Sequence, residues 1–215
     1  LMGLRARIRG WSKRKKIIIS ILLVILIGLG VAYALGVFSK DKKEEPAKPS
    51  EKYYSQLTGN EVAKDVSERP ILGVMMENSE EARPQTGLDD AGIVFETVTE
   101  GGITRYMALF QENMPENVGP VRSVRPPFVN WITGLDSSIA HVGGSEQALA
   151  MIDELNTKSL NQFKYPEPYY RVNSRPAPHN MYARTNGLRD LQKELDYKKS
   201  KFENFPRSND APSQT

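Results

Sequence analysis

Residues 92–111 read GIVFETVTEGGITRYMALFQ, and this stretch decides the fold class. Its first half is rich in β-branched and aromatic residues, and Ile93, Phe95 and Thr97 alternate onto one face. The Gly-Gly pair in the middle marks a turn, and a second apolar run follows it. The stretch therefore predicts a β-hairpin over residues 93–111.

Apolar runs on either side of the hairpin extend this prediction to a sheet with helices. Short runs bounded by glycine or proline are typical of buried strands, and they occur at residues 71–76 and 138–142. Caps and helical spacing predict helices from Pro126 or Pro127 to Gly134, over residues 146–155 after Ser145, and over residues 186–196. The alternation predicts one mixed α/β (α+β) globular domain over residues 57–197.

Residues 17–38 form a run of 22 residues without a charge. At a rise of about 1.5 Å per residue, a helix of this length spans about 33 Å, which crosses a hydrocarbon core of about 30 Å. Seven basic and no acidic residues lie within residues 1–16, so the positive-inside rule predicts a single-pass anchor with a cytoplasmic N-terminus and extracytoplasmic residues 39–215. The alternative is a cleaved signal peptide, since Ala32-Tyr33-Ala34 resembles a cleavage site. Both alternatives export the domain.

The segments that flank the predicted domain are polar. Residues 39–56 predict a linker, and residues 198–215 predict a tail or a linker to a second domain that this sequence lacks. Beyond residue 16 the chain carries 22 basic and 26 acidic residues, so the basic pI of about 9.0 comes from the N-terminus and does not indicate nucleic-acid binding. The absence of cysteine excludes disulfides and thiolate chemistry.

A loop bounded by glycine and proline, GPVRSVRPP, begins at residue 119 and carries two arginines, Arg122 and Arg125. Paired guanidinium groups suit carboxylate, phosphate or sulfate ligands. The alternative is that both arginines form salt bridges within the domain.

Both histidines of the chain lie in glycine- or proline-rich loops. A histidine is the usual acid–base residue near neutral pH, and a helix start after glycines offers free N–H groups to an anion. The alternative for the first loop is an ordinary strand-to-helix turn with a serine cap. No HExxH pattern and no cysteine ligand supports a metal site, and we expect neither a metal nor a cofactor. The residues concerned are His141, Gly143, Gly144, Ser145, His179 and Asn180.

Glu96, Glu100 and Arg105 are secondary candidates on the predicted hairpin. Paired carboxylates could act as acid and base, but a glutamate and an arginine across a hairpin more often form a cross-strand ion pair, which is the interpretation we favour. No serine-nucleophile motif is present.

Six separated stretches resemble the YerB-type family of bacterial envelope proteins, which are typically lipoproteins. They read RPILGVMMEN, ARPQTGL, AGIVFETVTEGGITR, GPVRSVR, HVGGS and APHN, and lie at residues 69–78, 82–88, 91–105, 119–125, 141–145 and 177–180. The resemblance covers about residues 57–195 and implies an extracytoplasmic location, but no activity is established for the domain. Family members often carry a lipidated cysteine and a second, smaller domain. This chain has no cysteine, so its apolar helix would have to provide the anchor.

The resemblance gathers the arginine and histidine loops into one set, for which we expect a single cleft. Its side chains would be Arg122, Arg125, His141, Ser145, His179 and Asn180, with the backbone of Gly143 and Gly144 between them. These groups favour an anionic envelope ligand, namely a glycan, wall polymer or carboxylate. The alternatives are an enzyme that acts on envelope polymers through His141 or His179, and a scaffold for a partner protein.

Overall fold

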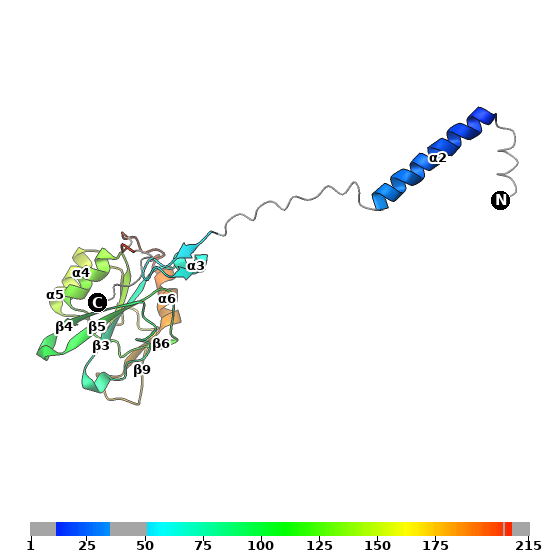
Figure 1. Cartoon of the computed structure of the whole chain (residues 1–215). Coiled ribbons are helices and arrows are strands. Elements are labelled where there is room, and N and C mark those ends of the chain that lie inside the picture. The colour runs from blue at the N-terminus through cyan, green and yellow to red at the C-terminus, as the bar shows by residue number, and fades with distance from the viewer. Residues whose placement is uncertain (1–11, 35–50, 204, 208–215) are drawn as a thin grey trace, which may run out of the picture. The chain divides into compact units, whose positions relative to one another are not determined.

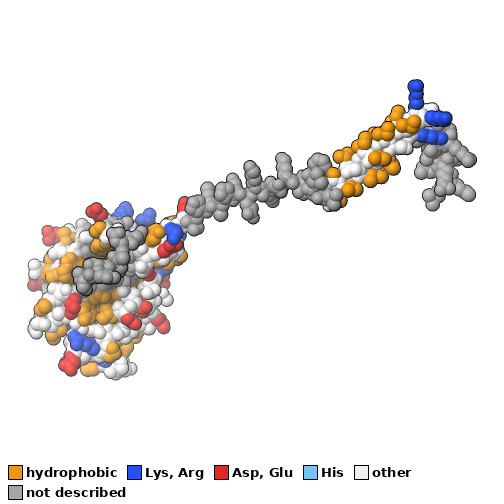
Figure 2. All heavy atoms as spheres, in the orientation of Figure 1, with side chains coloured by type: hydrophobic (Ala, Val, Ile, Leu, Met, Phe, Trp, Pro, Cys, Tyr) orange, Lys and Arg blue, Asp and Glu red, His pale blue; other side chains and the backbone are white. Residues whose placement is uncertain are grey.

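The computed structural model describes residues 12–34, 51–203 and 205–207. The chain divides into two compact units, residues 1–50 and residues 51–215 (Figure 1). In the first unit the described residues form helix α2 (Lys13–Ala34), whose leucine and isoleucine side chains are exposed (Figure 2).

Helix α2 is long and apolar enough to cross a membrane, with 22 residues and a mean hydropathy of 2.8 over an 18-residue window. A signal sequence near an N-terminus has the same length and composition. The helix begins before the uncharged run because lysine and arginine, at residues 13–16, are good helix formers. Residues 35–38 of the predicted span lie outside the described residues.

The centre of the second unit is a five-stranded sheet with the strand order β4-β5-β3-β7-β8. β4, β5 and β3 are antiparallel neighbours, whereas β3, β7 and β8 run parallel. The predicted hairpin is confirmed as β4 and β5, and the two predicted runs beside it as β3 and β7. A three-residue strand such as β8 is too short to show a periodicity in the sequence. The strands are β3 (Leu72–Glu77), β4 (Ile93–Val98), β5 (Thr104–Phe110), β7 (Ser138–His141) and β8 (Ser159–Asn161).

The predicted helices of this unit are confirmed within a few residues. Ser145 caps the second of them by accepting a hydrogen bond from the backbone N–H of Ala148 at 3.2 Å. The helices are α3 (Lys64–Ser67), α4 (Pro126–Gly134), α5 (Glu146–Glu154) and α6 (Thr185–Glu194), with 3-10 turns η1 (Glu80–Ala82) and η2 (Glu100–Gly102).

Helices cover one face of the large sheet, and a smaller sheet with α6 covers the other (Figure 1). Because strand side chains alternate, β3 serves both faces: Met75 packs with Phe128 of α4, and Met76 packs in the second core with Leu188 of α6. The domain is therefore a layered mixed α/β fold.

The smaller sheet has the strand order β6-β10-β9 and is antiparallel throughout. It lies outside the sequence prediction because its strands have two to four residues and prolines lie close to them. The strands are β6 (Asn117–Val118), β9 (Tyr169–Arg171) and β10 (Met181–Arg184).

The ends of the folded unit extend beyond the predicted boundaries. Residues 39–50 of the expected linker lie outside the described residues, and the rest of it includes β1 (Tyr53–Tyr54), which pairs with β2 (Glu61–Val62). In the expected tail, Ser200 is buried and its hydroxyl accepts a hydrogen bond from the backbone N–H of Ile71 at 3.0 Å. Residue 204 and residues 208–215 lie outside the described residues.

Candidate functional site

The loop that carries Arg122 lies at the carboxyl ends of two parallel strands, β3 and β7. The backbone N–H of Arg122 donates to the carbonyl of Met75 at 2.9 Å, and the N–H of Val142 donates to the carbonyl of Arg122 at 3.0 Å. The loop therefore bonds to one strand and to the continuation of the other, so it separates them where they end. In open α/β sheets, ligands bind in the crevice outside such strand ends.

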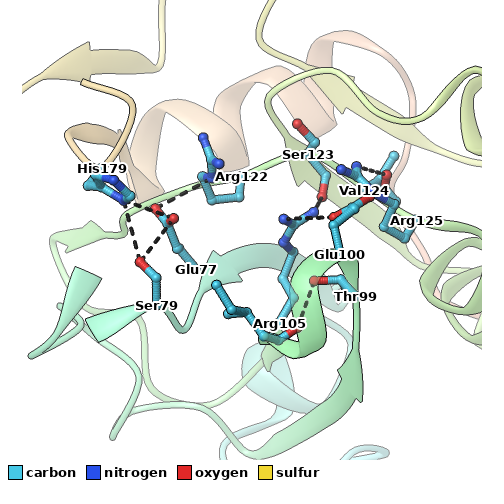
Figure 3. Close-up of polar contacts among 11 residues, drawn as sticks. Glu77, Ser79, Thr99, Glu100, Arg105, Arg122, Ser123, Val124, Arg125 and His179 are labelled. Carbon is cyan, nitrogen blue, oxygen red and sulfur yellow. Dashed lines mark hydrogen bonds and ion pairs between the residues drawn. The ribbon is translucent and has the colours of Figure 1, made fainter. Parts of the chain in front are cut away.

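Glu77, the last residue of β3, is the centre of a polar cluster (Figure 3). It is 6% exposed, and its Oε1 accepts from Nδ1 of His179 at 2.9 Å and from the hydroxyl of Ser79 at 3.2 Å. Its Oε2 lies 3.4 Å from Nε of Arg122, an ion-pair contact without hydrogen-bond geometry. We call Glu77, Ser79, Arg122 and His179 the Glu77 cluster.

The contact with Glu77 fixes the tautomer of His179. A carboxylate only accepts hydrogen bonds, so Nδ1 carries the proton and Nε2 is left for another partner. The hydroxyl of Ser79 lies 3.4 Å from the same Nδ1. A serine nucleophile needs the other ring nitrogen, opposite the carboxylate, so these residues do not form a Ser-His-Glu triad.

A second cluster adjoins the first and consists of Glu100, Arg105 and Arg125, which we call the Glu100 cluster (Figure 3). Arg105 lies directly opposite Glu77 on the neighbouring strand and donates to the carbonyl of Ser123 at 2.7 Å. Burial, and then the charge of Arg125, lowers the pKa of Arg105 to about 10. The hydrogen bond from Arg125 is the main cause of a lowered pKa of Glu100.

Arg105, Arg122 and Arg125 differ in the hydrogen bonds that their guanidinium groups make within the domain. Arg105 and Arg125 both hydrogen-bond backbone carbonyls and pair with Glu100. The guanidinium of Arg122 makes no hydrogen bond within the described part of the chain, although its side chain is only 26% exposed. Figure 3 shows its terminal nitrogens directed away from Glu77. Arg122 therefore keeps donors that a ligand can use.

A hollow of about 550 Å³ adjoins the Glu77 cluster through Ser79. Arg83, Gly102 and Thr104 also line it. Among the described residues, no group of three or more histidine, aspartate or glutamate side chains is placed to hold a metal ion.

His141 lies outside both clusters, which corrects the prediction that it faces a cleft. It is fully buried, its Nδ1 lies 2.8 Å from the carbonyl of Gly143, and its Nε2 lies 2.8 Å from the hydroxyl of Ser159. Burial lowers the pKa of His141 to about 4, so the ring is neutral near pH 7. Both of its nitrogens are used inside the fold, and none is left for a ligand.

The other residues of the predicted cleft also serve the fold. The side chain of Ser145 caps α5, and the backbone N–H of Gly143 donates to Asn161 Oδ1 at 3.3 Å. A Cβ at Gly144 would lie 2.8 Å from the Val124 side chain, so the close packing of the loop requires glycine there. Asn180 accepts from Arg171 at 2.6 Å and donates to the carbonyl of Val172 at 3.1 Å. The structure thus brings Arg122 and His179 to Glu77 and places Arg125 in the adjoining Glu100 cluster, whereas His141, Ser145 and Asn180 have structural roles.

The secondary candidates divide between two sets of contacts. Glu100 pairs with Arg105 at 3.6 Å, as expected for the hairpin, and also with Arg125. Glu96 instead accepts from the amide of Asn78 at 3.4 Å. The two glutamates therefore do not form one acid–base pair.

Glu77 and Ser79 are missing from the sequence prediction. A glutamate at the end of an apolar strand run can indicate a site residue, but a glutamate at a solvent-exposed strand end gives the same pattern. Only its position opposite Arg105 and beside the loop of Arg122 makes Glu77 a buried partner.

Comparison with known proteins places this fold and these loops in a family. “Putative lipoprotein YerB” of Bacillus subtilis (strain 168) is 35% identical over 161 residues, which cover 74% of this chain and 49% of that protein. The crystal structure of the YerB protein from Bacillus subtilis superposes with a TM-score of 0.65 and 35% identity, over 69% of this chain and 52% of that one. The chain thus spans about half the length of these relatives. The family described as “Protein of unknown function (DUF3048) N-terminal domain” matches residues 57–200, and the chain belongs to this family.

Proposed function

We propose that this chain is a membrane-anchored extracytoplasmic domain that binds an anionic envelope ligand at Arg122 and His179. The observation that carries the proposal is the guanidinium of Arg122, which is largely buried yet has no hydrogen-bond acceptor among the described residues. An anionic ligand would supply that acceptor. The family relationship to a protein named as a lipoprotein supports the envelope location.

The chemistry of the Glu77 cluster favours a ligand that carries both an acidic group and a hydroxyl group. The fork of Arg122 matches the two oxygens of a carboxylate or a phosphate. With its proton on Nδ1, neutral His179 accepts a ligand hydroxyl at Nε2. Acidic wall polymers and glycans carry both groups.

Glu77 does not prevent an anion from binding, because both of its oxygens face cationic or donor groups of the cluster. The two adjoining clusters hold three arginines and two glutamates, so the site is net positive even when His179 is neutral. The neighbouring Arg105 and Arg125 add to the positive potential at the strand ends.

A second candidate function is acid–base chemistry at His179. The 2.9 Å contact between Nδ1 and Glu77 orients the ring and leaves Nε2 for a substrate, as a carboxylate does for a general base. Incubation of the full chain with a glycerol phosphate oligomer distinguishes the two functions. An oligomer that is bound and recovered unchanged contradicts the catalytic candidate.

The proposed topology rests on α2 and on the seven basic residues that precede its apolar run. The positive-inside rule places those residues in the cytoplasm and residues 39–215 outside it. A phosphatase that is active only outside the cytoplasm, fused after Thr215, is expected to be active. A stable but inactive fusion would contradict this topology, and recovery of soluble protein that begins at Leu35 would show cleavage instead of anchoring.

Replacing Arg122 with glutamine is expected to weaken anion binding by about 1.5–3 kcal/mol, the range for hydrogen bonds to a charged group. Titration calorimetry with the full chain in nanodiscs measures this, with an N-acetylmuramyl peptide as the carboxylate probe and a glycerol phosphate oligomer as the phosphate probe. The control is Arg184→Gln, since Arg184 is an exposed arginine stacked on Tyr170.

Arg122→Gln also removes a partner of buried Glu77, so stability and binding must be separated. The double variant Glu77→Gln with Arg122→Gln removes both charges of this pair and is expected to recover stability while binding stays weak. Equal affinities of the wild type and a folded Arg122 variant for both probes would refute the proposed site.

A further inference from the structure

A cavity of about 640 Å³ is lined by the residues just before β3 and by residues of α6, and none of the residues of the two clusters lines it. Its apolar wall is formed by Pro70, Met114 and Tyr197. Two arginines, Arg69 and Arg189, also line it. A pocket with an apolar wall and a few convergent charged groups is the usual form of a small-molecule site.

Arg189 is a partly buried cation whose hydrogen-bond partners are all neutral. It donates to the carbonyl of Pro70, to Oε1 of Gln192 at 3.1 Å and to the sulfur of Met114 at 3.2 Å. Its Nε is buried without a hydrogen-bond partner, and no carboxylate of the described residues lies within ion-pair distance of it. Burial, and then the charge of Arg69, lowers the pKa of Arg189 to about 9.

Arg69 adds a second positive charge that the fold compensates only weakly. It donates to the carbonyls of Gln111 at 3.0 Å and Glu112 at 3.2 Å, both neutral groups. The carboxylate nearest to it, that of Asp65, is 3.7 Å away and mostly exposed to solvent. Buried charges in proteins are normally paired, because desolvation of an unpaired charge is costly.

The exposed charged side chains at the edge of the cavity do not neutralise the positive charge of Arg69 and Arg189. Lys193 and Asp190 pair with each other at 2.8 Å, and Lys198 pairs with Asp196 at 2.5 Å. The remaining charge in the cavity therefore belongs to the two guanidinium groups.

We infer that this cavity binds a small organic carboxylate with an apolar body. The carboxylate would lie between Arg69 and Arg189 and compensate their charges, while the apolar part would contact Met114 and Tyr197. Such a ligand would contact both the arginines and the apolar side chains, whereas inorganic phosphate would contact only the arginines. The inference is independent of the function proposed for Arg122.

The test uses the full chain in phosphatidylcholine nanodiscs and titrates 4-fluorophenylacetate by ¹⁹F NMR. The neutral comparison is 4-fluorophenylacetamide, which has the same body without the charge. The wild type is expected to bind the carboxylate and not the amide. Arg69→Gln and Arg189→Gln are each expected to weaken binding roughly ten- to a hundredfold. The exposed Arg184→Gln is expected to leave binding unchanged.

Circular dichroism of each variant separates a lost ligand contact from a lost fold. If Arg189→Gln does not fold, the Arg69→Gln variant is the test, because the Arg69 side chain hydrogen-bonds only the adjacent carbonyls of Gln111 and Glu112 among the described residues. The inference is overturned if the wild type does not bind the carboxylate, if it binds the amide equally well, or if a folded Arg69→Gln binds with wild-type affinity.

Discussion

Replacing Glu77 with alanine is expected to lower the free energy of unfolding by about 3–5 kcal/mol, the range for removing one partner of a buried ion pair. Glu77 is 6% exposed and contacts both Arg122 and His179. Without it, Arg122 has no carboxylate within ion-pair distance among the described residues, whereas Arg105 and Arg125 keep that of Glu100. Urea unfolding of the full chain in nanodiscs, followed by tryptophan fluorescence, measures the change.

Glu100→Ala is the matched control, because the Glu100 side chain is 60% exposed and pairs with two arginines of the same site. Solvent screens the exposed carboxylate of Glu100, and Arg105 and Arg125 keep their backbone carbonyl acceptors without it, so this change is expected to cost about 1 kcal/mol or less. If Glu77→Ala and Glu100→Ala had equal and small effects, Glu77 could not be the buried centre of the cluster.

Stability is expected to fall by about 3 kcal/mol between pH 7 and pH 4 because of His141 alone. Burial lowers its pKa from 6.5 to about 4 in the folded chain, and each pKa unit corresponds to about 1.4 kcal/mol. Above pH 6.5 the His141 ring is neutral in both the folded and the unfolded chain, so its burial does not reduce the free energy of unfolding. As the pH falls towards 4, the unfolded chain takes up a proton that the folded chain excludes, and the free energy of unfolding falls.

His141→Gln isolates this effect, since glutamine offers one donor for the carbonyl of Gly143 and one acceptor for the hydroxyl of Ser159 but does not titrate. Urea unfolding of both proteins at several pH values is the measurement. Carboxylates such as Glu100, whose pKa is lowered, contribute equally to both curves and cancel in the difference. Parallel curves from pH 7 to pH 4 would show that His141 is not buried in neutral form.

Local patterns were sufficient for the elements with several residues per face. The burial of β4 alternates with a period of two, α4 begins at Pro126, and Ser145 caps α5. Short elements gave no such signal. β6, β9 and β10 have two to four residues, and they become a sheet only because Tyr182 and its neighbours pair with distant segments.

The two histidines show why the site was harder to predict than the fold. Both lie in loops rich in glycine or proline, so the local sequence does not indicate which of them is the site residue. Packing then buries His141 between Gly143 and Ser159 and brings His179 to Glu77. Solvent access and bonding partners depend on segments that are distant in the sequence.

The sequence by itself determined the apolar helix near the N-terminus, the mixed α/β class and the family, because each depends on composition, periodicity or motifs read along the chain. The tertiary structure alone decided that Arg122 and His179 meet at Glu77, and that Arg69 and Arg189 share a cavity. The physical reason is that a buried charge is defined by the groups that surround it, and these come from strands and loops that only folding brings together.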